Sequence, residues 1–450
     1  MATAPESRER SDRALLTRLE SLSAVDKDYW AFRSKSRRGH AHALFQYPAM
    51  MVPQMQGELI RAVSATRPRL TSAFDPFAGS GTTLTEAMLH GLRFTGWDIN
   101  PLAVLLCQVK TGPFYPTALK EKVDEVMGRV AAHTSTTIET DLPNVDKWFR
   151  RDVSLSLSKL RRAIRSEPAR WARRFLWVAM AEAVRLTSNS RTSTFKLHIR
   201  PKEEIKARRL SPFGLFEEVA RRNIEHLEGQ CKILKQRGLL KRGKYMREAE
   251  TCLWDATKPL ASRRPSARYD LLISSPPYGD NKSTVPYGQY SYLPLNWIDG
   301  TDILDDWDKG WLRTTHEIDT RSLGGVLRGI ELATSELIEI SPAFRRAAEA
   351  LRNAPKDRLQ RVAAFCNDLN RAVEVILKEM KHGAYLVWTV GNRRVAGQCV
   401  PLDDIMTELL VTRGCRWIAK ISRPILSKRM AVKNNVSGTM RAESVLVFRK

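Results

Sequence analysis

Two short strings of residues, roughly 200 positions apart, combine side chains and backbone types that could form a reaction site. The first is Phe74–Thr83 (Phe-Asp-Pro-Phe-Ala-Gly-Ser-Gly-Thr-Thr), and the second is Ser274–Tyr278 (Ser-Ser-Pro-Pro-Tyr). In the first string the two glycines allow a sharp turn and let a ligand approach the backbone closely. The helix expected to follow presents free N–H groups at its start. Strand, glycine turn and helix in this order predict a site for a nucleoside cofactor.

Asp98 supports this interpretation, because it ends the next expected strand, 17 residues after Gly81. A carboxylate at such a strand end can accept hydrogen bonds from both hydroxyl groups of a ribose. The loop lacks the Gly-Lys-Ser/Thr of a phosphate loop, which excludes that class of nucleotide site, and it departs from the G-x-G-x-x-G spacing of dinucleotide folds.

The second string follows a buried-strand pattern at residues 269–274. Its two prolines stiffen the loop and donate no N–H group of their own. Ser275 Oγ and the Pro276 carbonyl are exposed acceptors in such a loop, and Tyr278 adds an aromatic face. The alternative is a proline turn after a strand, with no chemical role.

The elements around both strings alternate as parallel βαβ units do. Strand patterns at 73–77 and 94–98 flank a helix pattern at 83–90, and further strand patterns occur at 269–274, 384–390 and 444–448. This alternation predicts an α/β fold with a mostly parallel sheet.

The chain divides into four parts by composition. Residues 1–40 form a polar N-terminal segment, 41–114 a cofactor-binding part, and 115–245 a helical basic insertion. Residues 246–450 form the catalytic part, with a loop-rich insert at 280–345.

Charge points to a polyanionic partner. The net charge is +25, and residues 151–250 alone hold 25 Lys and Arg against 11 Asp and Glu. Lys and Arg neutralise phosphates and release counterions, so a nucleic acid is the expected partner. The six cysteines include no C-x-x-C pair, so we expect neither a zinc site nor a disulfide framework, and no metal.

Together the two strings resemble the signature of amino-methyltransferases, the S-adenosylmethionine-dependent enzymes of the Ser-Pro-Pro-Tyr type that methylate cytosine N4 or adenine N6 in DNA. The Asn100-Pro101 pair after Asp98 adds to the resemblance, which spans residues 45–109, 250–300 and 380–450. It implies a Rossmann-like class I methyltransferase fold: a doubly wound, mostly parallel sheet with a reversed last strand and a helical insertion.

For the cofactor S-adenosylmethionine, the resemblance implies three groups of contacts. They are the block before the glycine loop, which packs over the methionine end; the loop and the strand end after it; and an acid near the adenine ring. The implied residues are Tyr47, Pro48, Asp75, Pro76, Phe77, Ala78, Gly79, Ser80, Gly81, Thr82, Asp98, Ile99 and Asp255.

The second string fits the methylation of a nucleobase amine. The lone pair of such an amine is delocalised into the ring, so attack on a sulfonium methyl group requires the nitrogen to rehybridise towards sp³. Two acceptors aimed at the N–H groups favour this change, and a flipped-out base can stack on an aromatic ring. The predicted catalytic residues are Ser275, Pro276, Pro277 and Tyr278.

The base is predicted from the first position of this loop. Many adenine enzymes carry Asp there, so Ser275 favours N4 of cytosine, with adenine N6 as the alternative. Methylation at cytosine C5 needs a cysteine nucleophile, usually in a Pro-Cys loop, and the sequence contains no Pro-Cys dipeptide. An RNA amine methyltransferase and a catalytically inactive nucleic-acid-binding protein are further alternatives.

The order of the motifs indicates where DNA is read. The common cytosine-N4 arrangement puts the catalytic motif first, whereas here the long insertion separates the cofactor motif from the catalytic motif. The basic insertion is therefore the leading candidate for contact with double-stranded DNA, and its predicted DNA-binding residues are Arg191, Lys196 and Arg200. The alternative is a helical insert that only buttresses the sheet.

The expected setting follows from the resemblance. A restriction-modification or defence system would add a cognate restriction endonuclease or a defence-system subunit as partner. The sequence has no apolar run near 20 residues and no signal-peptide pattern, so we expect a cytoplasmic protein of a bacterial or archaeal cell, away from the membrane.

Overall fold

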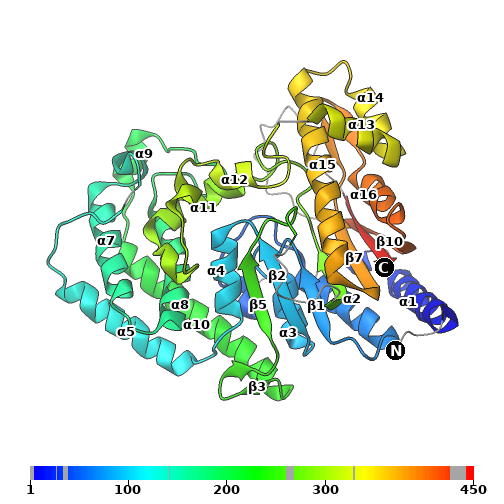
Figure 1. The fold of residues 1–450 in the computed structure, drawn as a ribbon. Coiled ribbons are helices and arrows are strands. Elements are labelled where there is room, and N and C mark those ends of the chain that lie inside the picture. The colour runs from blue at the N-terminus through cyan, green and yellow to red at the C-terminus, as the bar shows by residue number, and fades with distance from the viewer. Residues whose placement is uncertain are drawn as a thin grey trace.

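A seven-stranded sheet forms the centre of the molecule. The computed structural model describes residues 5–26, 28–33, 39–140, 142–259, 268–327, 330–425 and 442–450. The strand order is β10-β11-β7-β6-β1-β2-β5 (Figure 1). All neighbours from β5 to β7 pair in parallel, and β11 runs antiparallel to both β7 and β10. The strands are β1 (Ser72–Asp75), β2 (Arg93–Asp98), β5 (Ala249–Leu253), β6 (Tyr269–Ser274), β7 (Met380–Val390), β10 (Arg416–Pro424) and β11 (Ala442–Arg449).

Side chains that alternate along each strand divide the hydrophobic core into two clusters, one on each face of the sheet. In β6 the side chains of Leu271 and Ile273 join one hydrophobic cluster, and the side chain of Leu272 joins the other. Successive residues of a strand point to opposite faces, so a strand covered on both faces is apolar throughout. Helices on the first face are α2 (Pro53–Thr66), α3 (Thr82–Leu89) and α4 (Pro101–Lys110), and those on the second are α14 (Pro342–Ala350), α15 (Lys356–Glu379) and α16 (Leu402–Val411).

The insertion folds as a helical lobe, at the left of Figure 1. Residues from this lobe, from α2 and from the sheet belong to one continuous hydrophobic cluster, which includes Trp177, Leu59 and Ile273. The lobe therefore shares its core with the sheet domain. Its helices are α5 (Pro116–Ala132), α6 (Val145–Trp148), α7 (Arg151–Arg165), α8 (Arg170–Thr187), α9 (Lys202–Ala207) and α10 (Pro212–Gln236).

The insert at 280–345, predicted to be loop-rich, combines loops with several helices, of which α11 was not predicted. Tyr, Gly and Pro disfavour helices by intrinsic propensity. Burial outweighs that preference in α11, where Trp297 is fully buried and Pro294 lies inside the helix. The insert contains α11 (Tyr287–Trp297), η3 (Gly300–Asp302), η4 (Lys309–Leu312), α12 (Glu317–Arg321) and α13 (Ile330–Ile340).

The described part of the N-terminal polar segment packs on the sheet domain. Helix α1 (Pro5–Val25) buries Leu15 and Leu19, and Asp12 Oδ1 accepts a 3.0 Å hydrogen bond from the Tyr385 hydroxyl of β7. The remaining small elements are η1 (Tyr29–Ala31), η2 (His40–Ala43) and the hairpins β3 (Leu240–Lys241) with β4 (Lys244–Tyr245) and β8 (Arg393–Val395) with β9 (Gln398–Val400).

The predicted fold class is confirmed. The sheet is mostly parallel, helices cover both of its faces, β11 is the reversed last strand, and a helical insertion separates β2 from β5. Among the described helices, none is both long and apolar enough to cross a membrane.

Candidate functional site

One cavity joins the two strings. It has a volume of about 870 Å³, part of it open to solvent, and it lies where β1, β2, β5 and β6 end. Parallel strands bring their carboxyl ends to the same edge of the sheet, so loops distant in sequence meet there. The predicted residues that line the cavity are Tyr47, Pro48, Pro76, Phe77, Ala78, Gly79, Ser80, Thr82, Asp98, Ile99, Asp255, Ser275 and Pro277.

Four predicted residues lie outside the cavity lining: Asp75, Gly81, Pro276 and Tyr278. Asp75 is fully buried beneath the loop, where its Oδ1 accepts hydrogen bonds from Ser274 Oγ at 2.6 Å and from the Phe77 amide at 3.1 Å. Burial raises the pKa of Asp75 to about 6. Asp75 therefore connects the two strings from below rather than contacting the contents of the cavity.

The glycine loop needs glycine at both positions. Gly79 and Gly81 have φ values of 51° and 76°, in the left-handed region that favours glycine. A Cβ on Gly81 would lie 2.9 Å from the Sγ of Cys107. Beneath the loop, buried Lys110 donates a 2.5 Å hydrogen bond from Nζ to the Ser80 carbonyl, and burial lowers the pKa of Lys110 to about 8.

Asp98 holds the loop and also faces the cavity. Its Oδ2 accepts the Gly79 amide at 2.7 Å, and its Oδ1 accepts the Asn100 amide at 2.8 Å. Burial raises the pKa of Asp98 to about 6, so its carboxylate is ionised at neutral pH. Each carboxylate oxygen has two lone pairs, so both oxygens keep acceptor capacity for a ligand.

A network of polar and aromatic side chains closes the side of the cavity near Tyr47. The amide of Asn100 donates to the Tyr47 hydroxyl at 2.9 Å and to Ser291 Oγ at 2.8 Å. The rings of Tyr47 and Tyr287 stack with centroids 5.7 Å apart. Because Ser291 and Tyr287 belong to α11, this network attaches the insert to the cofactor side of the site.

The Ser-Pro-Pro-Tyr loop leaves the end of β6 with Ser275 in the cavity wall. Ser275 Oγ lies 3.2 Å from the Tyr278 hydroxyl, which in turn lies 3.0 Å from Glu443 Oε1. The ring of Tyr278 packs against the second hydrophobic cluster. Burial raises the pKa of Tyr278 well above its usual value, so its hydroxyl keeps its proton.

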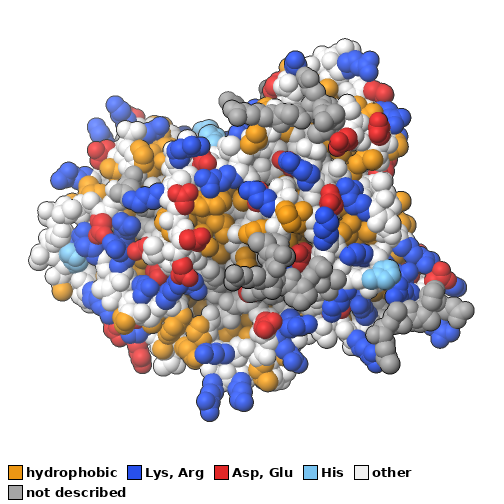
Figure 2. All heavy atoms as spheres, in the orientation of Figure 1, with side chains coloured by type: hydrophobic (Ala, Val, Ile, Leu, Met, Phe, Trp, Pro, Cys, Tyr) orange, Lys and Arg blue, Asp and Glu red, His pale blue; other side chains and the backbone are white. Residues whose placement is uncertain are grey.

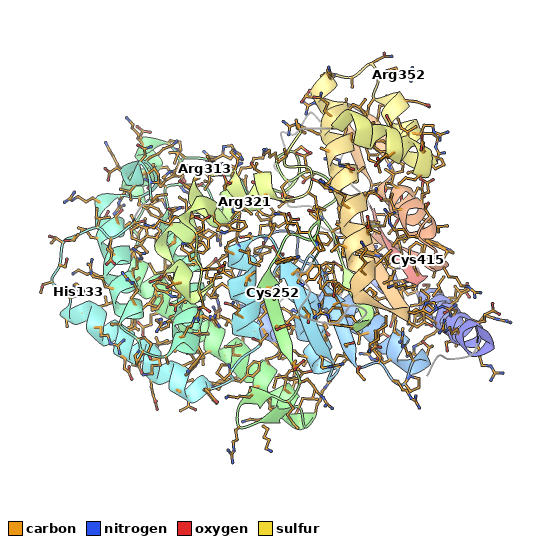
Figure 3. All side chains as sticks on the ribbon, in the orientation of Figure 1. His133, Cys252, Arg313, Arg321, Arg352 and Cys415 are labelled. Atoms are coloured by element: carbon orange, nitrogen blue, oxygen red, sulfur yellow. The ribbon has the colours of Figure 1, made fainter. Side chains whose placement is uncertain are left out.

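Several lining residues were not among the predicted site residues. Asn100 and residues 49–51 could have been predicted to line the cavity, because they adjoin positions on which the family resemblance rests. Nothing in the sequence pointed to Arg321, since it lies in the insert that was predicted to be loop-rich. Its guanidinium stacks over Trp311 at 4.0 Å and donates to Glu317 Oε1 at 3.0 Å. Figure 3 shows Arg321 and Arg313 in the region of α11 and α12, above and to the left of the central strands. The additional lining residues are Ala49, Met50, Met51, Asn100, Trp254, Ala256, Asn281, Tyr287, Ile318, Arg321, Ser322 and Leu323.

The predicted DNA-binding residues lie on the loop between α8 and α9, outside the lining of this cavity. Arg191 and Lys196 line a hollow of about 340 Å³ together with Tyr290 and Pro294 of α11. Arg200 instead pairs with Glu204. The loop that carries them therefore lies against the same helix that borders the cofactor side of the cavity.

A second, more strongly basic hollow of about 1190 Å³ is lined by Arg150, Lys206, Arg208 and Arg209. The guanidinium of Arg208 donates to the carbonyls of Leu186 and Ser188, which joins this hollow to the start of the loop. Figure 2 shows Lys and Arg side chains spread over the lobe and on both sides of the central region. Among the described residues, no group of three or more His, Cys, Asp or Glu is placed to hold a metal ion.

Comparison with known proteins gives a relative that covers nearly the whole chain. No protein-family model matches the chain. The Type II methyltransferase M.MvaI of Kocuria varians is 29% identical over 455 residues, which cover 97% of each chain. The Type II methyltransferase M.MjaII of Methanocaldococcus jannaschii is 28% identical over 95 residues, or 21% of this chain and 17% of that protein.

Among solved structures, the rRNA methyltransferase aviRa from Streptomyces viridochromogenes aligns over 90% of this chain and 86% of its own, with 11% identity and a TM-score of 0.30. That likeness is too weak for conclusions about fold or substrate. Over nearly its whole length, this chain is similar to a Type II methyltransferase, and the mostly parallel sheet with its reversed last strand is the fold expected of a methyltransferase.

Proposed function

We propose that this protein is a DNA methyltransferase that transfers a methyl group from S-adenosylmethionine to N4 of cytosine in duplex DNA. The observation that carries the proposal is the single cavity lined by both the glycine loop with Asp98 and the Ser-Pro-Pro-Tyr loop with Ser275. The full-length similarity to a Type II methyltransferase supports the same conclusion.

The cavity residues fit the cofactor. Asp98 has acceptor capacity for ribose hydroxyls, and Gly79, which lines the cavity, leaves the backbone open to close approach. Asp255, Trp254, Tyr47 and Pro48 line the same cavity. In the proposed complex Asp255 and its neighbour Trp254 would contact the adenine ring, and Tyr47 and Pro48 the methionine end. When bound, S-adenosylmethionine supplies an electrophilic methyl group on a sulfonium.

The Ser-Pro-Pro-Tyr loop would prepare the amine. Ser275 Oγ, in the cavity wall, would accept a hydrogen bond from one N–H group of the amine and draw the nitrogen towards sp³. The Pro276 carbonyl, expected as the second acceptor, lies outside the cavity lining, so it would have to turn towards the base when DNA binds. The amine nitrogen would then bond to the methyl carbon carried by the cofactor, while the electron pair of the carbon–sulfur bond stays on sulfur. The product amine would release its surplus proton to water, with no covalent bond between enzyme and base. Base flipping would bring the cytosine from the duplex to Ser275.

The basic lobe would hold the duplex. Arg191, Lys196 and Arg200 lie on the loop packed against α11, and the neighbouring hollow adds Lys206 and Arg209. Phosphate contacts of this kind position a protein on DNA without reading its sequence. A restriction-modification or defence system is the setting that the Type II relatives favour, and its endonuclease would be a separate partner.

Methyl transfer from tritium-labelled S-adenosylmethionine to unmethylated phage λ DNA tests the function. The wild-type protein should label DNA and leave RNA unlabelled. Ser275→Ala should bind the cofactor normally and transfer about 100-fold more slowly, because loss of one aligned hydrogen bond in the transition state has an effect of that order. Label in RNA alone would contradict the proposal.

A further inference from the structure

Glu443 was not predicted as part of the site, yet it contacts the catalytic loop. It lies at the start of β11, and its Oε1 is 3.0 Å from the hydroxyl of Tyr278. Its Oε2 pairs with buried Arg423, which stands directly opposite on the antiparallel strand β10. A carboxylate from the far end of the chain therefore lies behind the Ser-Pro-Pro-Tyr loop.

The chemistry of these three groups fixes the direction of their hydrogen bonds. Glu443, paired with a guanidinium, is a carboxylate, and a carboxylate only accepts. The single hydroxyl hydrogen of Tyr278 must therefore point to Glu443. The 3.2 Å contact between Ser275 Oγ and the Tyr278 oxygen then needs the hydrogen of Ser275.

The direction of the Ser275 O–H bond decides which hydrogen bonds Ser275 can make with a ligand in the cavity. Ser275 lines the cavity and Tyr278 does not, so only the serine oxygen is presented to a ligand. Its hydrogen is turned away towards Tyr278, and its lone pairs remain. Ser275 is then an acceptor with no hydrogen to donate into the cavity.

We propose that Glu443, acting through the Tyr278 hydroxyl, fixes Ser275 as a hydrogen-bond acceptor and so selects a base with an exocyclic amine over one with a carbonyl at the same position. An amine donates to such an oxygen, whereas a carbonyl oxygen is repelled by it. Glu443 is a positioning residue, since it reaches the base only through two other side chains. The proposal rests on the proposed function.

Two conservative variants disrupt the chain of hydrogen bonds, one by interrupting it and the other by reversing it. Tyr278→Phe keeps the ring and removes the hydroxyl, which frees the hydrogen of Ser275. Glu443→Gln keeps an acceptor for Arg423 but offers an N–H group to Tyr278, so that the tyrosine can donate to Ser275 instead. If loss of the Glu443 charge prevents folding, Tyr278→Phe still tests the proposal, because it leaves the pair with Arg423 intact.

The experiment measures single-turnover methyl transfer on a duplex that carries the recognition site mapped on methylated λ DNA. Each variant should be about 10-fold slower than wild type, the effect of losing one hydrogen bond to a charged network. The double variant should also be about 10-fold slower, since both changes break the same chain. Binding of S-adenosylmethionine should change less than 2-fold in all three.

A second readout isolates the direction of the hydrogen bond. A matched duplex carries a carbonyl in place of the target amine: deoxyuridine for deoxycytidine, or deoxyinosine if the target is adenine. The wild-type preference for binding the amine duplex should fall in Tyr278→Phe and Glu443→Gln. Lys420→Gln is the control, because Lys420 lies on β10 like Arg423, and the change breaks its 2.7 Å ion pair with Asp403 of α16 and should change neither readout.

The outcomes separate this proposal from the proposed function. An active wild type whose two variants multiply to about 100-fold, or whose preference for the amine duplex is unchanged in both, overturns the role of Glu443 and leaves the methyltransferase intact. A wild type that methylates neither DNA nor RNA overturns the proposed function and this proposal with it.

Discussion

Asp98 combines a structural and a binding task in one carboxylate. Its two oxygens hold the amides of Gly79 and Asn100, and both keep lone pairs for a ligand. The sequence predicted the position of this acid at a strand end. The pattern did not reveal that Asp98 also fixes the loop, because the contact with Gly79 depends on how β2 and the loop pack.

The pKa of Asp98 gives a prediction with a definite sign. Its pKa in the folded protein, about 6, lies above the ordinary value of 3.8, because burial disfavours the charge. The carboxyl therefore contributes stability below about pH 4, and that stability is lost as the pH rises through 6. Ribose binding needs the ionised form, so cofactor affinity should instead fall as the pH drops below 6.

Calorimetry at pH 7.5 and pH 5 measures this effect. Wild type should bind S-adenosylmethionine about 10-fold more weakly at pH 5, one pH unit below the pKa. Asp98→Asn should bind about 10-fold more weakly at pH 7.5, since a charge-assisted hydrogen bond is lost, and should show little further change at pH 5. Equal affinity of wild type at both pH values would remove the Asp98 charge from cofactor binding.

At the scale of elements, the loop between α8 and α9 should contact the DNA backbone. Changing Arg191, Lys196 and Arg200 together to Gln should weaken DNA binding and lower the slope of log affinity against log salt by up to about 3, since each phosphate contact contributes about 0.9. The pair of Arg200 with Glu204 makes the change smaller if that pair persists in the complex.

Titration of DNA binding over a series of salt concentrations gives this slope. The matched control changes Lys241, Lys244 and Arg247 to Gln. These exposed residues lie in and beside the hairpin of β3 and β4, below the sheet and away from the cavity (Figure 1). The control removes the same charge and should leave the slope near that of wild type. Equal salt slopes for wild type, the triple variant and the control would show that the loop between α8 and α9 does not contact phosphates and that the lobe only supports the sheet.

Helix α8 is attached to the insert by a cluster of polar side chains around Asp302. Asp302 of η3 is buried and accepts hydrogen bonds from Arg173 Nε at 2.8 Å, from Arg173 Nη2 at 2.6 Å and from Trp177 Nε1 at 2.7 Å. The guanidinium of Arg173 holds the pKa of Asp302 below its usual value, although burial acts in the opposite direction. This cluster ties the lobe to the catalytic half of the chain.

Asp302→Ala should therefore lower stability by about 3 kcal/mol or more, because it leaves a cation without its partner in a partly buried site. Asp305→Ala is the control: its 2.6 Å pair with Arg170 is at the surface, with the Asp305 side chain 89% exposed, and should matter by less than about 1 kcal/mol. Thermal unfolding of the three proteins shows the difference. Equal melting temperatures for both variants would mean that the lobe is held by its apolar core alone.

Prediction of elements from the sequence succeeded where burial and propensity agree. The all-apolar interior of β6 and the β-branched and aromatic residues of β7 were predicted as strands, and both are buried strands of the sheet. Helix α11 was not predicted, because Tyr287, Gly288 and Pro294 carry turn signals that only tertiary packing outweighs. Arg321 was missed for the same reason, since its position depends on the helix α12 that follows.

At the scale of the whole molecule, the meeting of the two strings could be predicted and the contact with Glu443 could not. Parallel strands place their carboxyl ends together by geometry alone, so the cavity follows from recognising β1, β2 and β6. The last strand carries Glu443 to the catalytic loop because β11 inserts between β7 and β10, and this placement depends on strand order across the entire sheet. A local sequence pattern contains no such information.

The central claim concerns the atom that is methylated, and mass spectrometry of nucleosides from cellular DNA and RNA tests it most directly. Cells expressing the wild-type protein should contain 4-methyldeoxycytidine in DNA, and cells expressing Ser275→Ala should not. Only 6-methyladenine would keep the amine mechanism and refute the choice of base. Only 5-methylcytosine, or a methylated base in RNA alone, would contradict the account.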